Sequence, residues 1–158
     1  MNLIDAIRKE MGGGSACLFT PFIFTPEITA IARRLNVYSG FHTARNIFEW
    51  MLANISYIDD EKFRDSAEVF EEKIGNCAEQ AFLYITIARC AGLKAGFADV
   101  SIDSHGKPVR HACSCVELER NLLVDTAYET FGINHIAYRL LDDDELSGIY
   151  SYFRKMQP

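Results

Sequence analysis

The sequence predicts a run of helices, then an antiparallel sheet, then a closing helix. Apolar residues recur at helical spacing in several segments before Gly92, alternate with polar residues from Lys94 onward, and return to helical spacing after Asp142. Helices and strands in separate runs are typical of folds in which helices pack against one sheet. With a length of 158 residues, the chain is expected to form one domain over residues 1–158.

The first half contains four segments with helical signals. Residues 2–11 have helical spacing, and Thr25 is a suitable cap for a helix over residues 26–35 that begins with a proline. Residues 42–55 carry one apolar stripe, which predicts a helix packed on the core. A short helix is expected to begin at Ser66 and to end near Gly75.

The central helix is expected to begin at Cys77. Apolar and small residues recur through Cys90, and Gly92 is a suitable left-handed cap, so this helix should be largely buried. The first helical turn has free N–H groups and the positive end of the helix dipole, which stabilise a thiolate. Cys77 is therefore a candidate nucleophile, although a small buried cysteine with no chemistry is the alternative.

Three strands and a closing helix are expected in the second half. The strands span about residues 94–103, 109–118 and 122–125, and turn residues separate them, so they form an antiparallel meander. Apolar residues at helical spacing predict the C-terminal helix at about 142–155.

Composition limits the partners. The formal net charge of −6 argues against a nucleic acid, which would require a basic face. The sequence lacks a signal peptide and any segment long enough to span a membrane, so a cytoplasmic protein is expected. Five cysteines cannot all pair within one chain, and we interpret them as reduced thiols.

A cysteine at a helix start, followed by a histidine and an aspartate on successive strands, is a recurring way to assemble a thiol nucleophile. His111 and Asp125 supply the base and the orienting carboxylate in that order. Direct opposition of these two residues would require a turn centred near Leu118, whereas the turn-like residues are centred at Arg120.

Five short motifs between residues 43 and 126 occur in a specific order and at specific spacing. They span residues 50–57, 73–81, 88–93, 111–112 and 123–126. In these segments the sequence resembles the transglutaminase-like domains of bacteria and archaea, within the papain-like superfamily of thiol enzymes. The resemblance implies an α+β fold with a helical N-terminal part and the cysteine helix packed on an antiparallel sheet. It also implies that Cys77 is the nucleophile, His111 the base and Asp125 the third member of a triad.

One position departs from that family. Its members usually have tryptophan after the His-Ala pair, whereas this chain has Cys113, so substrate class is less transferable. On an alternating strand Cys113 shares a face with His111 and should line the cleft or the core behind it. If the site is catalytic, another aromatic should fill the vacated volume, and Trp50 and Tyr57 are the available side chains.

Acyl transfer also requires hydrogen-bond donors for an oxyanion. The backbone N–H of Cys77 is one donor. For the second, Trp50 and Tyr57 lie on one edge of a helix and its end, and similarity to the family favours an aromatic donor upstream, with Tyr57 ahead of Trp50. For each of these two residues, packing in the core is the more common role. Glu79 suits the helix dipole and is interpreted as structural.

A zinc site is the main rival interpretation. His111, Cys113 and Cys115 alternate on one strand face and, with Cys77, could supply four ligands. His135 lies outside any motif and competes for the base role only if the strand prediction is wrong.

The leading hypothesis is a thiol acyl-transfer enzyme that cleaves an amide or peptide bond through a thioester, with hydrolysis favoured over transamidation. Its partners would be a protein, a peptide or a small amide, and no cofactor is expected. Metal activation is not expected either, because no acidic loop has calcium-ligand spacing. The alternative is a non-catalytic module of the same fold that binds a partner or zinc.

Overall fold

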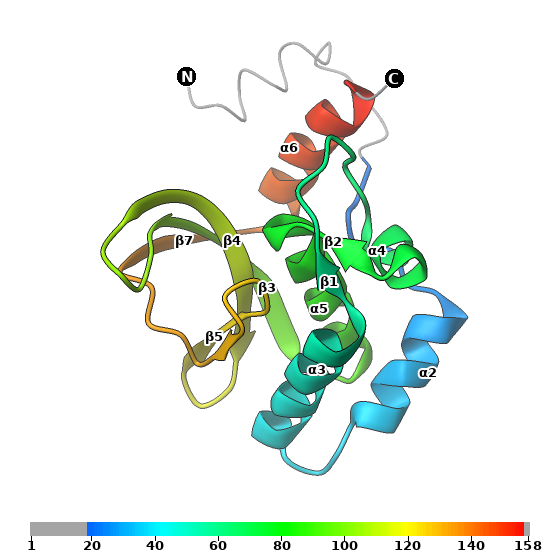
Figure 1. Ribbon diagram of the computed structural model, residues 1–158. Coiled ribbons are helices and arrows are strands. Elements are labelled where there is room, and N and C mark those ends of the chain that lie inside the picture. The colour runs from blue at the N-terminus through cyan, green and yellow to red at the C-terminus, as the bar shows by residue number, and fades with distance from the viewer. Residues whose placement is uncertain (1–18, 157–158) are drawn as a thin grey trace.

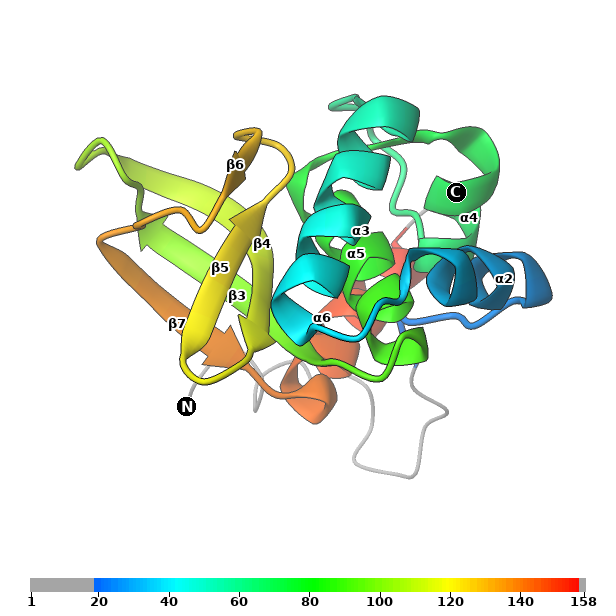
Figure 2. The same ribbon diagram turned by 90° about the horizontal axis from the view of Figure 1, so that it is seen from below.

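The computed structural model describes residues 19–156. Its helices gather on one side and its main sheet on the other, with α5 between them (Figures 1 and 2). The helices are α2 (Pro26–Leu35), α3 (Gly40–Asn54), α4 (Ser66–Glu72), α5 (Cys77–Cys90) and α6 (Asp143–Lys155). This arrangement confirms the α+β prediction. The helix predicted at 2–11 lies outside the described residues.

Local signals set the helix ends. The Thr25 hydroxyl accepts a hydrogen bond from the Ile28 N–H at 3.1 Å, so the predicted cap of α2 is confirmed. Ser39 caps α3 in the same way. Helix α4 ends at Glu72, earlier than predicted, because Lys73 adopts a left-handed conformation with φ of 61°.

Helix α5 is the centre of the core. Every residue from Glu79 to Ala88 is buried. One side of α5 packs on α3 through Leu83, Tyr84 and Ile87, and another packs under the sheet through Phe82 and Ile85. A helix that is apolar nearly all round needs neighbours on all sides, and α5 has them.

The main sheet has the order β6-β5-β4-β3-β7, and every neighbouring pair is antiparallel. Its strands are β3 (Lys94–Ile102), β4 (Pro108–Glu117), β5 (Asn121–Asp125), β6 (Thr130–Phe131) and β7 (Ala137–Leu141). The predicted meander corresponds to β3, β4 and β5. The sequence analysis did not predict β6 and β7, and β7 crosses to the far edge to pair with β3.

A second, two-stranded sheet lies beside the start of α5. Strand β1 (Ser56–Tyr57) pairs in parallel with β2 (Ile74–Gly75), so Tyr57 lies across from Gly75. This pairing holds the chain just before Cys77 against the end of α3.

The two faces of β4 point to different surroundings. The Ser114 hydroxyl donates to the Ala81 carbonyl of α5 at 3.5 Å. Cys113 and Cys115 point the other way, into an apolar cluster whose other buried members are Ala98, Val100, Leu123 and Ile133. Among residues 19–156, the longest apolar stretch in any helix falls short of what a membrane crossing requires.

Candidate active site

Cys77 is the first residue of α5, as predicted. The Asn76 side chain accepts from the Glu79 N–H at 2.9 Å, and the Glu79 carboxylate accepts from the Asn76 N–H at 2.9 Å. This reciprocal pair is a capping box, which leaves the Cys77 side chain out of the capping interactions. Cys77 is partly exposed, as a nucleophile requires.

An ion cluster around the buried Arg64 side chain supports that helix start. The Arg64 side chain is 2 % exposed and contacts the carboxylates of Asp60 at 2.8 Å, Glu72 at 2.8 Å and Glu79 at 3.5 Å. Burial raises the pKa of the Glu79 carboxyl, while the backbone N–H groups of Asn76 and Arg64 lower it. Glu79 thus has the structural surroundings expected of it. Arg64 had no sequence signal, because its partners come from three separate segments.

The register between β4 and β5 differs from direct opposition of the histidine and the aspartate. Ser114 pairs with Val124, so Asp125 lies across from Cys113 and diagonal to His111. The two side chains still meet, because diagonal neighbours share a face and remain within reach of long side chains. His111 Nε2 donates to Asp125 Oδ2 at 2.7 Å.

Asp125 is fully buried and accepts three hydrogen bonds. Its Oδ1 accepts from the Tyr128 backbone N–H at 2.8 Å. Its Oδ2 accepts from both His111 Nε2 and His135 Nε2, each at 2.7 Å. A buried carboxylate is costly unless it is well hydrogen-bonded, and these three donors supply that stabilisation.

The His111 imidazole interacts with both Asp125 and Cys77. Burial opposes a charged imidazole, but the hydrogen bond to Asp125 and the interaction with Cys77 outweigh it and raise the pKa of His111 from 6.5 to about 9. Because Nε2 is used by Asp125, Nδ1 is the nitrogen left for Cys77. The Tyr128 ring lies against the imidazole, with centroids 4.4 Å apart.

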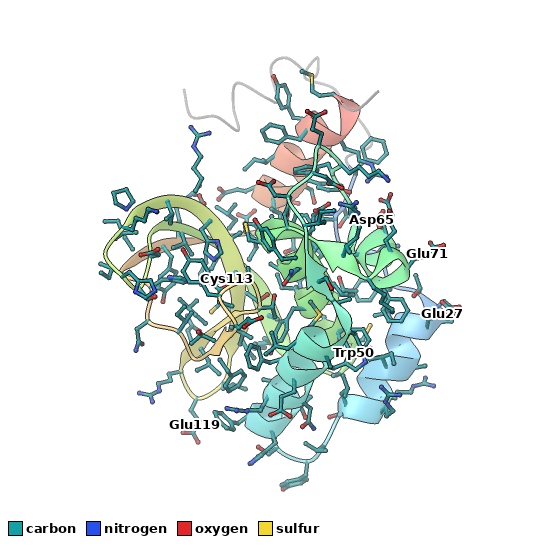
Figure 3. The ribbon with its side chains drawn as sticks, in the orientation of Figure 1. Glu27, Trp50, Asp65, Glu71, Cys113 and Glu119 are labelled. Atoms are coloured by element: carbon teal, nitrogen blue, oxygen red, sulfur yellow. The ribbon has the colours of Figure 1, made fainter. Side chains whose placement is uncertain are left out.

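The aromatic beside His111 is therefore Tyr128, and the prediction that Trp50 or Tyr57 fills this volume was wrong. Trp50 stacks on Phe70 with centroids 5.8 Å apart and belongs to the helical core. Figure 3 shows Trp50 on α3 and Cys113 in the sheet. Tyr128 lies in the turn after β5, where the sequence analysis assigned no structure.

Tyr57, the other predicted oxyanion donor, lies on β1, beside the strand that leads into Cys77. It is 55 % exposed and is paired with Gly75, two residues before Cys77. Burial and then the charge of Cys77 raise the pKa of the Tyr57 phenol, which keeps it protonated as a hydrogen-bond donor.

Gln80 joins the two halves of the site. Its Nε2 donates to the Gly75 carbonyl at 3.0 Å, and its Oε1 accepts from the Thr126 hydroxyl at 2.7 Å. Thr126 follows Asp125, so one buried amide connects the chain before Cys77 to the end of β5. The sequence analysis had not assigned Gln80 this role.

The four ligands of the rival zinc site do not form one cluster in the described part of the chain. Among those residues, the set with metal-ligand spacing is His111, Asp125 and His135, whose ligand atoms lie within 4.8 Å of one another, and it contains no cysteine. Cys113 is 2 % exposed, and burial raises the pKa of its thiol, which disfavours the thiolate that zinc binds. Asp125 already accepts hydrogen bonds from His111, His135 and the Tyr128 N–H.

An open groove of about 640 Å³ adjoins the histidine side of the site. Tyr128, which covers His111, is one of its walls. The other lining residues are Ser104, His105, Thr130, Gly132, Ile133 and Asn134.

Known structures share this fold. A candidate cysteine protease of Cytophaga hutchinsonii has a TM-score of 0.57 and 21 % identity, over 75 % of this chain and 46 % of its own. A candidate protease of Parabacteroides distasonis has a TM-score of 0.53 and 13 % identity, over 83 % of this chain and 30 % of its own. LapG of Legionella pneumophila has a TM-score of 0.55 and 10 % identity, over 99 % of both chains.

The chain thus spans less than half the length of the first two proteins, and at these identities the likeness is one of fold. No curated protein sequence matches the chain. The family model of the transglutaminase-like superfamily matches residues 29–120, which is more than half of the 158 residues. The chain belongs to the transglutaminase-like superfamily.

Proposed function

We propose that this protein is a thiol acyl-transfer enzyme that cleaves an amide or peptide bond through a thioester on Cys77. The observation that carries the proposal is the partly exposed thiol at the start of α5, near a histidine that a buried carboxylate orients. Structural likeness to candidate cysteine proteases adds support at the level of fold.

Acylation follows from the positions of three side chains. His111 accepts the Cys77 proton at Nδ1, and Asp125 stabilises the imidazolium through Nε2. The thiolate attacks the carbonyl carbon and forms the C–S bond. The Cys77 backbone N–H and the Tyr57 phenol are the proposed donors to the oxyanion. When the intermediate collapses, the C–N bond breaks and the leaving amine takes the proton from His111.

Deacylation reverses these roles with a new acceptor. His111 removes a proton from water, the resulting hydroxide attacks the thioester, and the C–S bond breaks to release an acid and restore the thiol. An amine in place of water would give a new amide. We favour water, so the proposed reaction is hydrolysis, and the substrate is a protein, a peptide or a small amide.

A peptide library incubated with the protein tests both outcomes. We expect new peptide ends, found by mass spectrometry, and loss of all cleavage in Cys77→Ala. Cys90→Ala is the matched control, because Cys90 is also a partly exposed free thiol but lies at the other end of α5. An alkylamine in the same reaction reports transamidation as a mass increase on the acyl product.

The result against the proposal is a wild-type protein that neither cleaves peptides nor forms a trapped thioester. Zinc near one atom per chain by elemental analysis, lost in Cys77→Ala, would instead support the binding module.

A further inference from the structure

One buried histidine has no part in the proposed reaction. The His135 side chain is fully buried, and its Nε2 lies 2.7 Å from the same Asp125 oxygen that His111 uses. It comes from the connection between β6 and β7, whereas His111 comes from β4. The carboxylate of this triad is therefore shared between two histidines.

The backbone decides the tautomer of His135. The Ser104 N–H donates to His135 Nδ1 at 3.1 Å. A backbone N–H is always a donor, so Nδ1 carries a lone pair and the ring proton lies on Nε2. A proton on Nδ1 would point at the Ser104 N–H, so the geometry holds the ring proton of His135 on Nε2.

The segment that carries His135 is anchored at both ends. The Gly132 and Ile133 N–H groups donate to the Leu123 carbonyl at 2.9 and 3.2 Å, and the Ile136 N–H donates to the Ile102 carbonyl at 3.0 Å. Gly132 adopts φ of +76°, which allows the chain to leave β6 toward the opposite edge of the sheet. His135 is thus a fixed donor and not a mobile one.

We propose that His135 is a positioning residue that, with the Tyr128 backbone N–H, fixes the Asp125 carboxylate so that Oδ2 always faces His111 Nε2. The two donors bind opposite oxygens of Asp125, so the carboxylate cannot rotate without losing one of them. This proposal rests on the proposed function for its relevance to catalysis, but it concerns the carboxylate itself.

Other groups around His135 do not replace this role. The His111 and Tyr128 rings lie 5.5 and 5.4 Å from its ring, measured between centroids. Asp103 accepts from the Tyr128 hydroxyl at 2.8 Å and from two backbone N–H groups, so its carboxylate is already engaged. Asp125 is the acceptor that is left for His135 Nε2.

Two substitutions separate the effect of the His135 hydrogen bond from the effect of its side-chain volume. His135→Gln can place an amide N–H where Nε2 was, whereas His135→Leu keeps most of the volume and no donor. His42→Gln and His42→Leu are matched controls, because His42 is exposed on α3. We expect kcat to fall about ten- to a hundredfold in His135→Leu with KM nearly unchanged, as expected for a misplaced catalytic group. His135→Gln should keep most of the wild-type kcat.

Nitrogen NMR of labelled histidines gives a readout that does not depend on activity. In His135→Leu the pKa of His111 should fall from about 9 toward its ordinary value, because a carboxylate free to turn spends less time at Nε2. A purely structural role would lower thermal stability and leave this pKa unchanged. A rise in the pKa of His111 would mean that His135 only competes with His111 for the Asp125 oxygen. Either result would overturn the proposal.

If His135→Leu does not fold, NMR of the wild-type protein tests the proposal instead. Its NMR spectrum should show the ring proton of His135 on Nε2, and the opposite tautomer would overturn the proposal. If the NMR results agree but no substrate is cleaved, the proposed function fails and the positioning role stands.

Discussion

Replacement of Asp125 by asparagine should disable the site while leaving the fold intact. The Tyr128 N–H is a fixed donor to Oδ1, so the amide oxygen of the new side chain must take that place. The amide NH₂ then takes the place of Oδ2 and faces both histidines. His111 must present a lone pair at Nε2 and move its proton to Nδ1, where it cannot accept the proton of Cys77.

The size of each effect follows from the same contacts. A carboxamide that supports the wrong imidazole tautomer lowers kcat by about 10⁴-fold in a serine-protease triad, and we expect roughly 10³- to 10⁴-fold here. The rise in the pKa of His111 from 6.5 to about 9 corresponds to about 3 kcal/mol of stabilisation of the charged imidazole. Asp125 and Cys77 both contribute to it. The carboxamide would also force His135 into a donor conflict with Ser104, which costs about 1–3 kcal/mol.

Stability should therefore fall by about 2–4 kcal/mol, with a pH dependence of known sign. A raised histidine pKa stabilises the fold fully below pH 6.5, and that contribution disappears as the pH rises through about 9. The difference in unfolding free energy between wild type and Asp125→Asn should shrink over this interval. Chemical denaturation at several pH values measures it, with Asp99→Asn, an exposed change on β3, as control.

A double variant separates the two costs. Adding His135→Leu to Asp125→Asn removes the conflict with Ser104, so stability should recover in part while kcat stays low. The reasoning is refuted if Asp125→Asn keeps kcat within about tenfold of wild type, or if NMR finds the His111 proton still on Nε2.

Three further predictions concern single side chains. Cys77 should react with iodoacetamide faster than Cys113 near neutral pH, as followed per residue by mass spectrometry; the reverse order would mean that the nucleophile is misassigned. The high-pH limb of kcat/KM should lie near pH 9, because the free protein loses the His111 proton above that pKa, and a limb near pH 7 would contradict the raised pKa of His111. Tyr57→Phe should lower kcat about ten- to a hundredfold without slowing alkylation of Cys77, whereas unchanged turnover would remove Tyr57 from the oxyanion site.

The start of α5 was predictable because its signals are local. Asn76, Glu79 and helical spacing act within one turn, and the structure begins the helix at Cys77. The meeting of His111 with Asp125 was predicted from strand order, but the register was not, because one residue in the turn decides which pairs are opposite. In the observed register the diagonal contact keeps the two side chains within reach.

The other contacts of the site depend on long connections that sequence patterns do not reveal. His135 reaches Asp125 only because β7 pairs with β3 instead of its sequence neighbour β6. Strand β7 is an edge strand with little alternation in burial, so the period-2 signal was weak. Arg64 likewise finds Glu79 through a loop whose composition resembles solvated surface.

The late position of β7 in the chain has a consequence for the order of folding. Helix α5 and strands β3 to β5 can assemble from residues up to 125, but His135 arrives only when β7 docks at the far edge. Pairings across such sequence distances form slowly. During refolding, Cys77 should therefore gain its full reactivity only together with hydrogen-exchange protection of β7, which pulsed alkylation can follow.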